Sequence, residues 1–414
     1  MSLFNRANIL LPKADVPLET WSVVACDQYT SEEDYWERVA ASVALKASTY
    51  HMIFPEIYLE EGNPDAHISS INRTMQDYLQ QGIFEEYPDS LLYVVRTFLD
   101  GSVRRGIMGT VDLEAYDYHK GSTSAIRATE GTVLERIPPR VKVREHALLE
   151  LPHILMLLDD ESRTLIEGIS LTDAKKVYDF EMMENGGRIE GYLISNRCCD
   201  EFLAKLLAYE DLRRNVIGED AVIFAVGDGN HSLATAKACW EAKKVALDPS
   251  LLEEHPARFA LVELGNLYDG PDVFEPIHRV IFDTEPALLR AAFEAYAAPY
   301  LREAGIPLTF CSGSDEVQYF LSLPEGMIAV GLLQSFLDEY LQGAAGRIDY
   351  IHGAAVVRSL SSVATSAGFI LPPFAVSDLF ISVQKNGALP RKTFSMGEAE
   401  QKRFYLECRK ITED

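Results

Sequence analysis

Ala221–Lys244 reads AVIFAVGDGNHSLATAKACWEAKK, and we expect the rest of the chain to fold around this stretch. Its first six residues, Ala221–Val226, are apolar and partly β-branched, which predicts a buried strand. Glycines at positions 227 and 229 then allow a tight turn, because glycine accepts backbone angles that other residues avoid. From Ser232 onward, apolar residues recur three and four positions apart, which predicts an amphipathic helix.

The turn in this stretch gathers polar groups beside a helix start. A strand followed by a helix places them at the carboxyl edge of a sheet, where free N–H groups of the helix bind anions. Asp228 is the candidate for a catalytic base or a metal ligand. His231 is the candidate for a base or for a hydrogen-bond donor to phosphate. A hydrogen-bonded helix cap is the alternative role for His231. The candidate anion-binding residues of the turn are Gly227, Gly229, Asn230 and Ser232.

A cationic segment, Arg127–Arg144, reads RATEGTVLERIPPRVKVR. Five Arg or Lys side chains minus two Glu give it a charge of +3, in a chain whose formal charge is −25. Arginine binds carboxylate and phosphate oxygens through paired N–H groups, and Pro138-Pro139 would stiffen a loop that presents them. Anion binding is one interpretation, and pairing with the chain's own 63 Asp and Glu is the other. The candidates are Arg127, Arg136, Arg140 and Arg144.

A second acid candidate, Asp27, lies near the start of the sequence. Trp21–Ala25 predicts a short strand, and Thr30 with Glu33 has the spacing of a capping box before a helix. Asp27 would therefore lie on a strand-to-helix turn, where its carboxylate is a plausible catalytic group. A solvated turn aspartate is the alternative interpretation.

Two later segments carry further candidates for phosphate binding. His278 and Arg279 lie in the strand-like stretch Pro276–Phe282, and they would face the same crevice if that strand neighbours the strand of the glycine turn. A purely structural role is the alternative. The loop GALPRKTFSM brings Arg391 and Lys392 next to hydroxyl side chains. It either supplies hydrogen-bond donors to phosphate or is a polar turn.

Composition and charge exclude several classes of protein. The charge of −25 argues against general binding of nucleic acids or anionic membranes, because affinity for phosphate comes from cations. The sequence has no apolar run of about eighteen residues and no basic-then-apolar start, so we expect a cytoplasmic protein. The six cysteines have no zinc or disulfide spacing. Adjacent Cys198-Cys199 is either a redox pair or, as the alternative, two small partly buried side chains.

Strand-like and helix-like segments alternate along the chain, which predicts an α/β to α+β fold with mixed β-sheets and flanking helices. At 414 residues the chain exceeds one ordinary core. Near the end, Val317–Leu323 and Met327–Leu333 flank a Pro-Glu-Gly turn and predict a hairpin. Changes of pattern predict an N-terminal α/β region 1–105, a central region 106–284 with both motifs, and a C-terminal α+β region 285–414.

Motifs along nearly the whole chain resemble one bacterial family. In chain order they are ACDQYTSEEDYW, RATEGTVLERIPPRVKVREHALLELPH, VGDGNHSLATA, HPARFALVELGN, EPIHRVIF and LPRKTFSMGEAEQKRFYLE. Through them the chain is identified as a member of the uncharacterised bacterial proteins grouped as domain of unknown function 1015.

The glycine turn also resembles, more remotely, the ParB/sulfiredoxin-like superfamily, in which a D-G-H-H-R turn opens a helix and cradles nucleotide phosphates. In the free serine kinase branch, this turn supports phosphoryl transfer from a nucleotide to the serine hydroxyl. Asp228, Gly229 and His231 match the turn, whereas Asn230 replaces its first histidine and Ser232 its arginine. The resemblance implies a ParB/sulfiredoxin-like core around the DGNH turn and ATP or ADP as the nucleotide.

Because this chain lacks the arginine of the D-G-H-H-R turn, other groups would have to donate hydrogen bonds to the phosphate. These would be backbone N–H groups, the hydroxyls of Ser232 and Thr235, or the segment Arg127–Arg144. Phosphoryl transfer usually also uses Mg²⁺, for which Asp228 is the candidate ligand, and an acid that accepts the proton of the nucleophile.

Three functions remain open from the sequence. The first is a nucleotide-dependent phosphotransferase that acts on a small hydroxylated metabolite, such as serine or a relative. The second is a phosphatase that acts on a phosphorylated metabolite without a nucleotide. The third is a non-catalytic sensor of a nucleotide or phosphometabolite. No P-loop, kinase glycine loop or dinucleotide fingerprint is present, so nucleotide use rests on the resemblance.

Overall fold

The computed structural model describes residues 2–58, 64–270, 273–390, 392–394 and 396–413. Contacts within the chain divide it into two compact units. Unit 1 comprises Met1–Ala128, Thr132–Gly270 and Met396–Asp414, and unit 2 comprises Thr129–Gly131 and Pro271–Ser395. Unit 1 draws on all three predicted sequence regions, because the last residues of the chain return to it.

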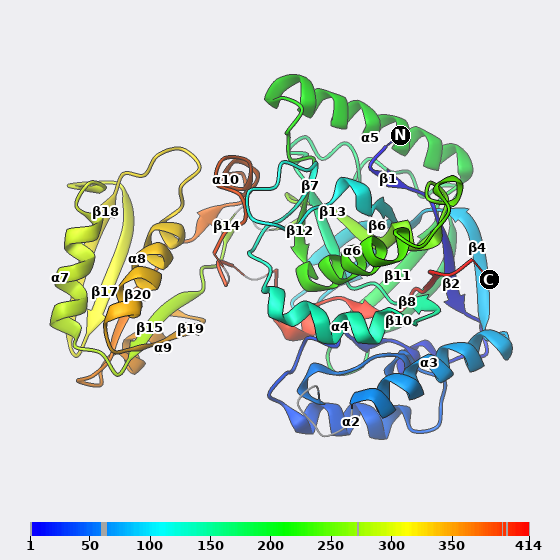
Figure 1. Cartoon of the computed structure of the whole chain (residues 1–414), viewed down its shortest axis with the longest axis horizontal. Helices are drawn as coiled ribbons and strands as arrows, with labels where there is room; N and C mark the ends of the chain where they lie inside the picture. Colours follow the sequence, from blue (N-terminus) through cyan, green and yellow to red (C-terminus); the bar gives the residue numbers. More distant parts are fainter. Residues whose placement is uncertain (1, 59–63, 271–272, 391, 395, 414) are drawn as a thin grey trace. The chain divides into compact units, whose positions relative to one another are not determined.

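Unit 1 is built on a nine-stranded mixed sheet (Figure 1). Its strands are β1 (Phe4–Asn5), β5 (Leu92–Thr97), β6 (Val103–Asp112), β7 (Ile126–Ala128), β9 (Leu155–Leu158), β10 (Lys175–Glu181), β11 (Arg188–Leu193), β12 (Phe224–Asp228) and β13 (Phe259–Asn266). They lie in the order β10-β11-β5-β6-β13-β9-β12-β7, and β1 also pairs with β6. Neighbours are antiparallel except for two parallel pairs, β9 with β13 and β7 with β12.

Each face of this sheet packs against its own core. Successive strand residues point to opposite faces, so Leu92 and Val94 belong to one core and Tyr93 to the other. The first core includes side chains of α1 (Leu18–Trp21), α2 (Glu33–Val43) and α3 (Pro64–Gln80). The second includes side chains of α5 (Asn196–Ile217) and α6 (Asn230–Lys244). Mixed sheets with flanking helices are therefore confirmed as the fold class.

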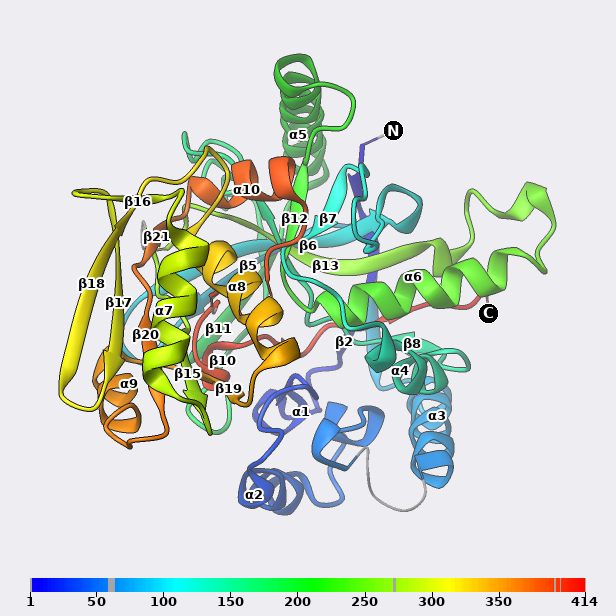
Figure 2. The same ribbon diagram turned by 60° about the vertical axis from the view of Figure 1, so that its left-hand side comes forward.

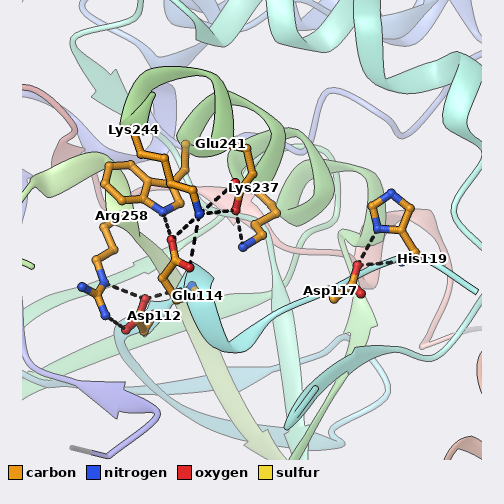
Figure 3. Close-up of polar contacts among 9 residues, drawn as sticks. Asp112, Glu114, Asp117, His119, Lys237, Glu241, Lys244 and Arg258 are labelled. Atoms are coloured by element: carbon orange, nitrogen blue, oxygen red, sulfur yellow. Dashed lines mark hydrogen bonds and ion pairs between the residues drawn. The ribbon is translucent and has the colours of Figure 1, made fainter. Parts of the chain in front are cut away.

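The strand and helix predicted for Ala221–Lys244 are confirmed as β12 and α6, with shifted bounds. The strand continues through Asp228, and only Gly229 has a left-handed backbone, with φ of 79°. Towards its end, α6 contacts Glu114, which lies in the short 3-10 helix directly after β6 (Figure 3). Glu114 accepts hydrogen bonds from the Trp240 indole and from Lys244, and nearby Arg258 pairs with Asp112 at the end of β6.

The predicted stiff loop around Pro138-Pro139 is instead a helix, α4 (Ile137–Arg144). Proline fits the first turn of a helix, because the N–H that it lacks has no partner there. The consequence for the arginines is that Arg136, Arg140 and Arg144 follow one another at four-residue spacing, so they lie along one side of α4.

Smaller strand pairs complete unit 1. β2 (Ala7–Pro12) pairs with β4 (Phe84–Ser90), β3 (Val23–Val24) with β22 (Phe404–Tyr405), and β8 (Leu149–Glu150) with β23 (Arg409–Lys410). The last two pairs return the end of the chain to unit 1. Short 3-10 helices of the chain lie at Thr49–Met52, Glu56–Tyr58, Leu113–Ala115, Leu134–Arg136, Pro249–Leu251, Pro256–Arg258 and Ala399–Gln401.

Unit 2 has a six-stranded antiparallel sheet in the order β16-β18-β17-β20-β15-β19. The predicted hairpin of Val317–Leu323 with Met327–Leu333 is wrong, because Ala329–Gly343 is a helix whose Leu333, Phe336 and Leu337 are buried at helical spacing. The bounds in unit 2 are α7 (Pro286–Ala297), α8 (Ala329–Gly343), α9 (Ala354–Leu360), α10 (Asp378–Asn386), β14 (Val273–Phe274), β15 (His278–Phe282), β16 (Leu301–Arg302), β17 (Ile306–Ser312), β18 (Asp315–Leu321), β19 (Arg347–Ile351), β20 (Ala367–Ile370) and β21 (Phe374–Ala375).

Within the part of the chain that the structure describes, no helix combines the length and apolar character needed to cross a bilayer.

Gly229 offers a test of the turn. A Cβ at this position would lie 3.0 Å from the Ile154 Cα, and the left-handed backbone disfavours any side chain. We expect Gly229→Ala to lower the free energy of unfolding by about 1–3 kcal/mol, measured by urea denaturation. Gly270→Ala is the control, because its Cβ would meet no atom within 4 Å. Equal unfolding midpoints for the two variants would contradict this account of the turn.

Candidate functional site

The candidate site lies in unit 1, where β12 ends and α6 begins. Asp228 is the last residue of β12, and Gly229 is the N-cap of α6 with no side-chain cap hydrogen bond. The first N–H groups of a helix have no partner within it, so they are available to a ligand. The Asn230 side-chain oxygen is buried at the same turn without a hydrogen-bond partner among the described residues. The N–H groups of this helix start can therefore bind an anion, whereas the Asn230 oxygen can only accept a hydrogen bond and would need a donor from the ligand.

A buried histidine connects this turn to the N-terminal acid. The Nε2 atom of His153 lies 3.1 Å from the Ser232 hydroxyl and 3.6 Å from the Asp27 carboxylate. The His153 side chain is only 5% exposed, whereas that of Asp27 is 26% exposed. Asp27 can therefore reach a ligand, and the more deeply buried His153 holds it in place.

The two groups of this pair stabilise each other's charged forms. Burial disfavours the carboxylate of Asp27, but the positive charge of His153, 3.6 Å away, outweighs burial and holds the pKa of Asp27 well below its ordinary value. Burial likewise disfavours the imidazolium, but the carboxylates of Asp27, Asp228 and Glu56 raise the pKa of His153. Asp27 is therefore an ionised base at neutral pH, and it faces a cation.

Tyr405 holds the other side of the imidazole. Its hydroxyl lies 3.1 Å from the His153 Nδ1 atom and 3.1 Å from the Cys26 sulfur. The Cys26 backbone N–H also donates to this hydroxyl, at 3.2 Å. Burial, followed by the charges of Asp27 and Glu56, raises the pKa of Cys26 to about 12. The Cys26 thiol stays protonated at neutral pH, so it is not an activated nucleophile.

Lys402 brings a cation to the glycine turn. Its ammonium lies 3.4 Å from the Asp228 carboxylate, and its side chain is 14% exposed. Buried Arg96 fixes the segment that carries it, by donating to the backbone carbonyls of Glu400, Gln401 and Lys402. The end of the chain thus supplies both Lys402 and Tyr405 to the site.

Helix α4 lies beside α6 in both views (Figures 1 and 2). It brings the cationic segment to the glycine turn, and the Val133 backbone N–H donates to the His231 Nε2 atom at 3.3 Å. Burial and the charges of Arg140 and Arg136 lower the pKa of His231 to about 4. His231 is therefore neutral at pH 7, and its Nε2 lone pair is already used by Val133.

The arginines of α4 differ in their partners. Arg140 pairs with Glu56 and donates to the Arg136 carbonyl, while Arg144 donates to the buried Glu150 carboxylate at 2.6 Å. The side chain of Arg136 is exposed. Pairing with acids of the same chain thus accounts for two of the three arginines, and Arg136 is the one that solvent or a ligand can reach.

The remaining candidates belong to other parts of the chain. Arg127 is buried and donates to the backbone carbonyls of Ser124 and Asp220, so it holds a loop in place. His278 and Arg279 lie on β15 in the sheet of unit 2, where Arg279 is buried and donates to Gln334 at 2.9 Å. Lys392 belongs to unit 2 as well, and Arg391 lies outside the described residues.

Cys198 and Cys199 are both free thiols, with Cys199 buried. No group of three or more His, Cys, Asp or Glu side chains that could hold a metal occurs among the described residues.

Sequence reasoning missed His153, Tyr405, Lys402 and Glu56. His153 and Tyr405 fall within motifs that carry the family resemblance, but neither has a spacing that signals catalysis. Only the fold brings these side chains to Asp27 and the glycine turn. A search for titratable residues beside the glycine turn in three dimensions is what finds them.

Comparison with known proteins gives a family and distant structural likenesses. The family described as "Protein of unknown function (DUF1015)" matches residues 7–360. Among curated proteins, none matches the chain.

Three solved structures are similar to this chain. SbnI of Staphylococcus aureus with a C-terminal truncation has 11% identity and a TM-score of 0.35, covering 73% of this chain and 81% of that one. A conserved hypothetical protein from Pyrococcus furiosus has 10% identity and a TM-score of 0.33, covering 72% and 90%. A mutant free serine kinase in complex with AMP has 11% identity and a TM-score of 0.36, covering 73% and 91%.

The Asp27–His153 pair predicts a pH-dependent contribution to stability. Folding raises the pKa of His153, so its stabilising effect is complete below the ordinary value of 6.5 and is lost as the pH rises through the folded pKa. The pKa of Asp27 is lowered, so its effect is constant above 3.8. We expect the loss of unfolding free energy in His153→Gln to be larger at about pH 6 than at about pH 9, measured by urea denaturation.

Replacement of a solvent-exposed histidine provides the control. The His146 side chain is 78% exposed, so we expect His146→Gln to cause a loss that hardly differs between the two pH values. If the loss in His153→Gln is the same at both pH values, His153 is not charged beside Asp27.

Proposed function

The chain belongs to the DUF1015 family, and for its site we propose transfer of a phosphoryl group from a nucleotide to the hydroxyl of a small metabolite. The observation that carries this proposal is the position of the Asp27 carboxylate, 3.6 Å from the His153 Nε2 atom, which in turn lies 3.1 Å from Ser232 in the first turn of uncapped α6. A base, an anion site and a nearby cation are together the groups that this chemistry requires.

Each step can be assigned to residues of unit 1. The phosphate oxygens bind the N–H groups at the start of α6, with positive charge from Lys402. The substrate hydroxyl attacks phosphorus as its proton passes to Asp27, and the bond from phosphorus to the leaving oxygen breaks with its electrons on that oxygen. The imidazolium of His153 orients Asp27 through the 3.6 Å contact.

We propose ATP or ADP as the phosphoryl donor and Mg²⁺ as the metal. Mg²⁺ at such sites takes one or two carboxylates together with substrate phosphates, so Asp228 fits as a single protein ligand beside the helix start. The bound ion would neutralise charge on the transferred phosphoryl group. Serine or a relative is the proposed acceptor class, and the cytoplasm is the proposed location.

His231 has a different role from the one that its position in the motif suggests. Since the Val133 N–H already occupies its Nε2 atom, we assign it to holding the Arg136 segment against α6. Proton acceptance then falls to Asp27.

The experiment compares the wild type with Asp27→Asn. We expect the wild type, given ATP or ADP, Mg²⁺ and a panel of hydroxylated metabolites, to form a phosphate ester detected by ³¹P NMR. Asp27→Asn removes the base and should lower turnover by about 10²- to 10⁴-fold, while nucleotide still raises the melting temperature. Asp65→Asn is the control, since Asp65 is in the first turn of α3 and outside the site.

Two outcomes would replace the proposal. Release of inorganic phosphate from a phosphorylated metabolite without nucleotide, dependent on Asp27, would indicate a phosphatase. Tight nucleotide or phosphometabolite binding with no turnover in any combination would indicate a sensor.

A further inference from the structure

A cavity of about 140 Å³ lies in unit 1 next to the proposed catalytic groups. His153 and Ser232 line it, together with Cys26 and Tyr405, so it adjoins the Asp27–His153 pair. Its remaining walls are mostly apolar and come from the segment 52–56, α3, α4, the segment 147–154 with β8, and β13. The apolar side chains that matter here are Met52, Ile53, Phe54, Met75, Leu149 and Leu261.

The charged groups in the cavity wall all have partners of opposite charge, and that of His153 is Asp27 at 3.6 Å. Glu56 pairs with Arg140, and Glu150 accepts from Arg144 at 2.6 Å and from Arg409 at 2.6 Å. A ligand that enters the cavity therefore meets closed ion pairs and apolar surface. An uncharged apolar group suits these walls, whereas a charged group would have to break an ion pair.

The size of the cavity sets the size of the group. In another protein, an engineered cavity of about 150 Å³ lined by aliphatic and aromatic side chains binds benzene. A cavity of about 140 Å³ accordingly accepts one six-membered ring or a branched aliphatic chain of similar volume.

We propose that this cavity binds the apolar part of the hydroxylated substrate. The Ser232 hydroxyl and the His153 ring belong both to the cavity wall and to the contacts around Asp27, so a short alcohol with its ring in the cavity has its hydroxyl near Asp27. The substrate is then a relative of serine that carries a compact apolar group. The assignment of its hydroxyl as the phosphoryl acceptor rests on the proposed function, but occupancy of the cavity does not.

The test uses benzyl alcohol as the probe, with binding measured by calorimetry and by protein-observed NMR on the whole chain. We expect saturable binding to the wild type with a negative heat-capacity change, the mark of apolar burial. Ala147 is buried in the cavity wall, and Ala147→Phe would fill the space. We expect this variant to bind benzyl alcohol at least about tenfold more weakly.

Two further variants keep the test decisive. Ala41→Phe is the matched control, since Ala41 is exposed on α2, and its affinity should equal that of the wild type. Met75→Ala enlarges the cavity and should shift preference from benzyl alcohol towards naphthylmethanol, so a result remains if Ala147→Phe does not fold.

The outcomes separate this proposal from the proposed function. In one outcome, benzyl alcohol binds saturably, Ala147→Phe weakens this binding, and no alcohol is phosphorylated. This result supports the cavity as an apolar binding site and overturns the proposed phosphotransferase activity. Phosphorylation of serine at the same rate in wild type and Ala147→Phe, with no benzyl alcohol binding, overturns the cavity assignment alone. Displacement of benzyl alcohol by adenosine would assign the cavity to a nucleotide base and overturn the substrate assignment.

Discussion

The return of the end of the chain to the N-terminal segment is the constraint on which the site depends. β22 pairs with β3 in antiparallel register, Phe404 with Val24 and Tyr405 with Val23. This pairing brings Tyr405 to His153 and Lys402 to Asp228, although these partners lie far apart in the sequence. Without it, the glycine turn would keep its helix start but lose its nearest cation and the group that fixes the imidazole.

Buried charges hold this returning segment. Arg403 pairs with Glu263 on β13 at 3.0 Å and with Glu407 at 2.5 Å, and Glu407 accepts from Tyr178 on β10 at 2.6 Å. Buried Arg96 satisfies the backbone carbonyls just before Arg403. Removing one partner of such a network leaves a buried charge uncompensated, which is far more destabilising than losing a surface pair. The structure thus fixes the position of the site through charge pairing inside unit 1.

Neighbouring charges shift the pKa values of the two histidines of the site in opposite directions. Both are shielded from water, which favours the neutral ring. His153 faces three carboxylates and its pKa rises, whereas His231 faces Arg136 and Arg140 and its pKa falls to about 4. The motif histidine is the weaker candidate for proton chemistry because the Val133 N–H already occupies its Nε2 atom. The stronger pair is formed by a histidine and an aspartate that belong to different motifs.

The sequence alone determined the local elements around Ala221–Lys244, because a buried strand, a left-handed glycine and an amphipathic helix each follow from neighbouring residues. It also determined the family, since the motifs that carry the resemblance run along nearly the whole chain and the family match covers residues 7–360. Local patterns gave wrong predictions where one sequence pattern is compatible with two kinds of secondary structure. Pro138-Pro139 suits a stiff loop as well as a helix start, and Met327–Leu333 is too short an apolar run to separate strand from helix.

Only the tertiary structure decided which polar residues act together. Arg140 and Arg144 are cationic in the sequence, but in the fold their charges are balanced by Glu56 and Glu150. His153 holds Asp27 in position, and Tyr405 holds His153. The spacing of these residues in the sequence predicts neither contact. The physical reason is that charge and pKa depend on distance and burial, and these are set by packing between segments that are remote in the chain.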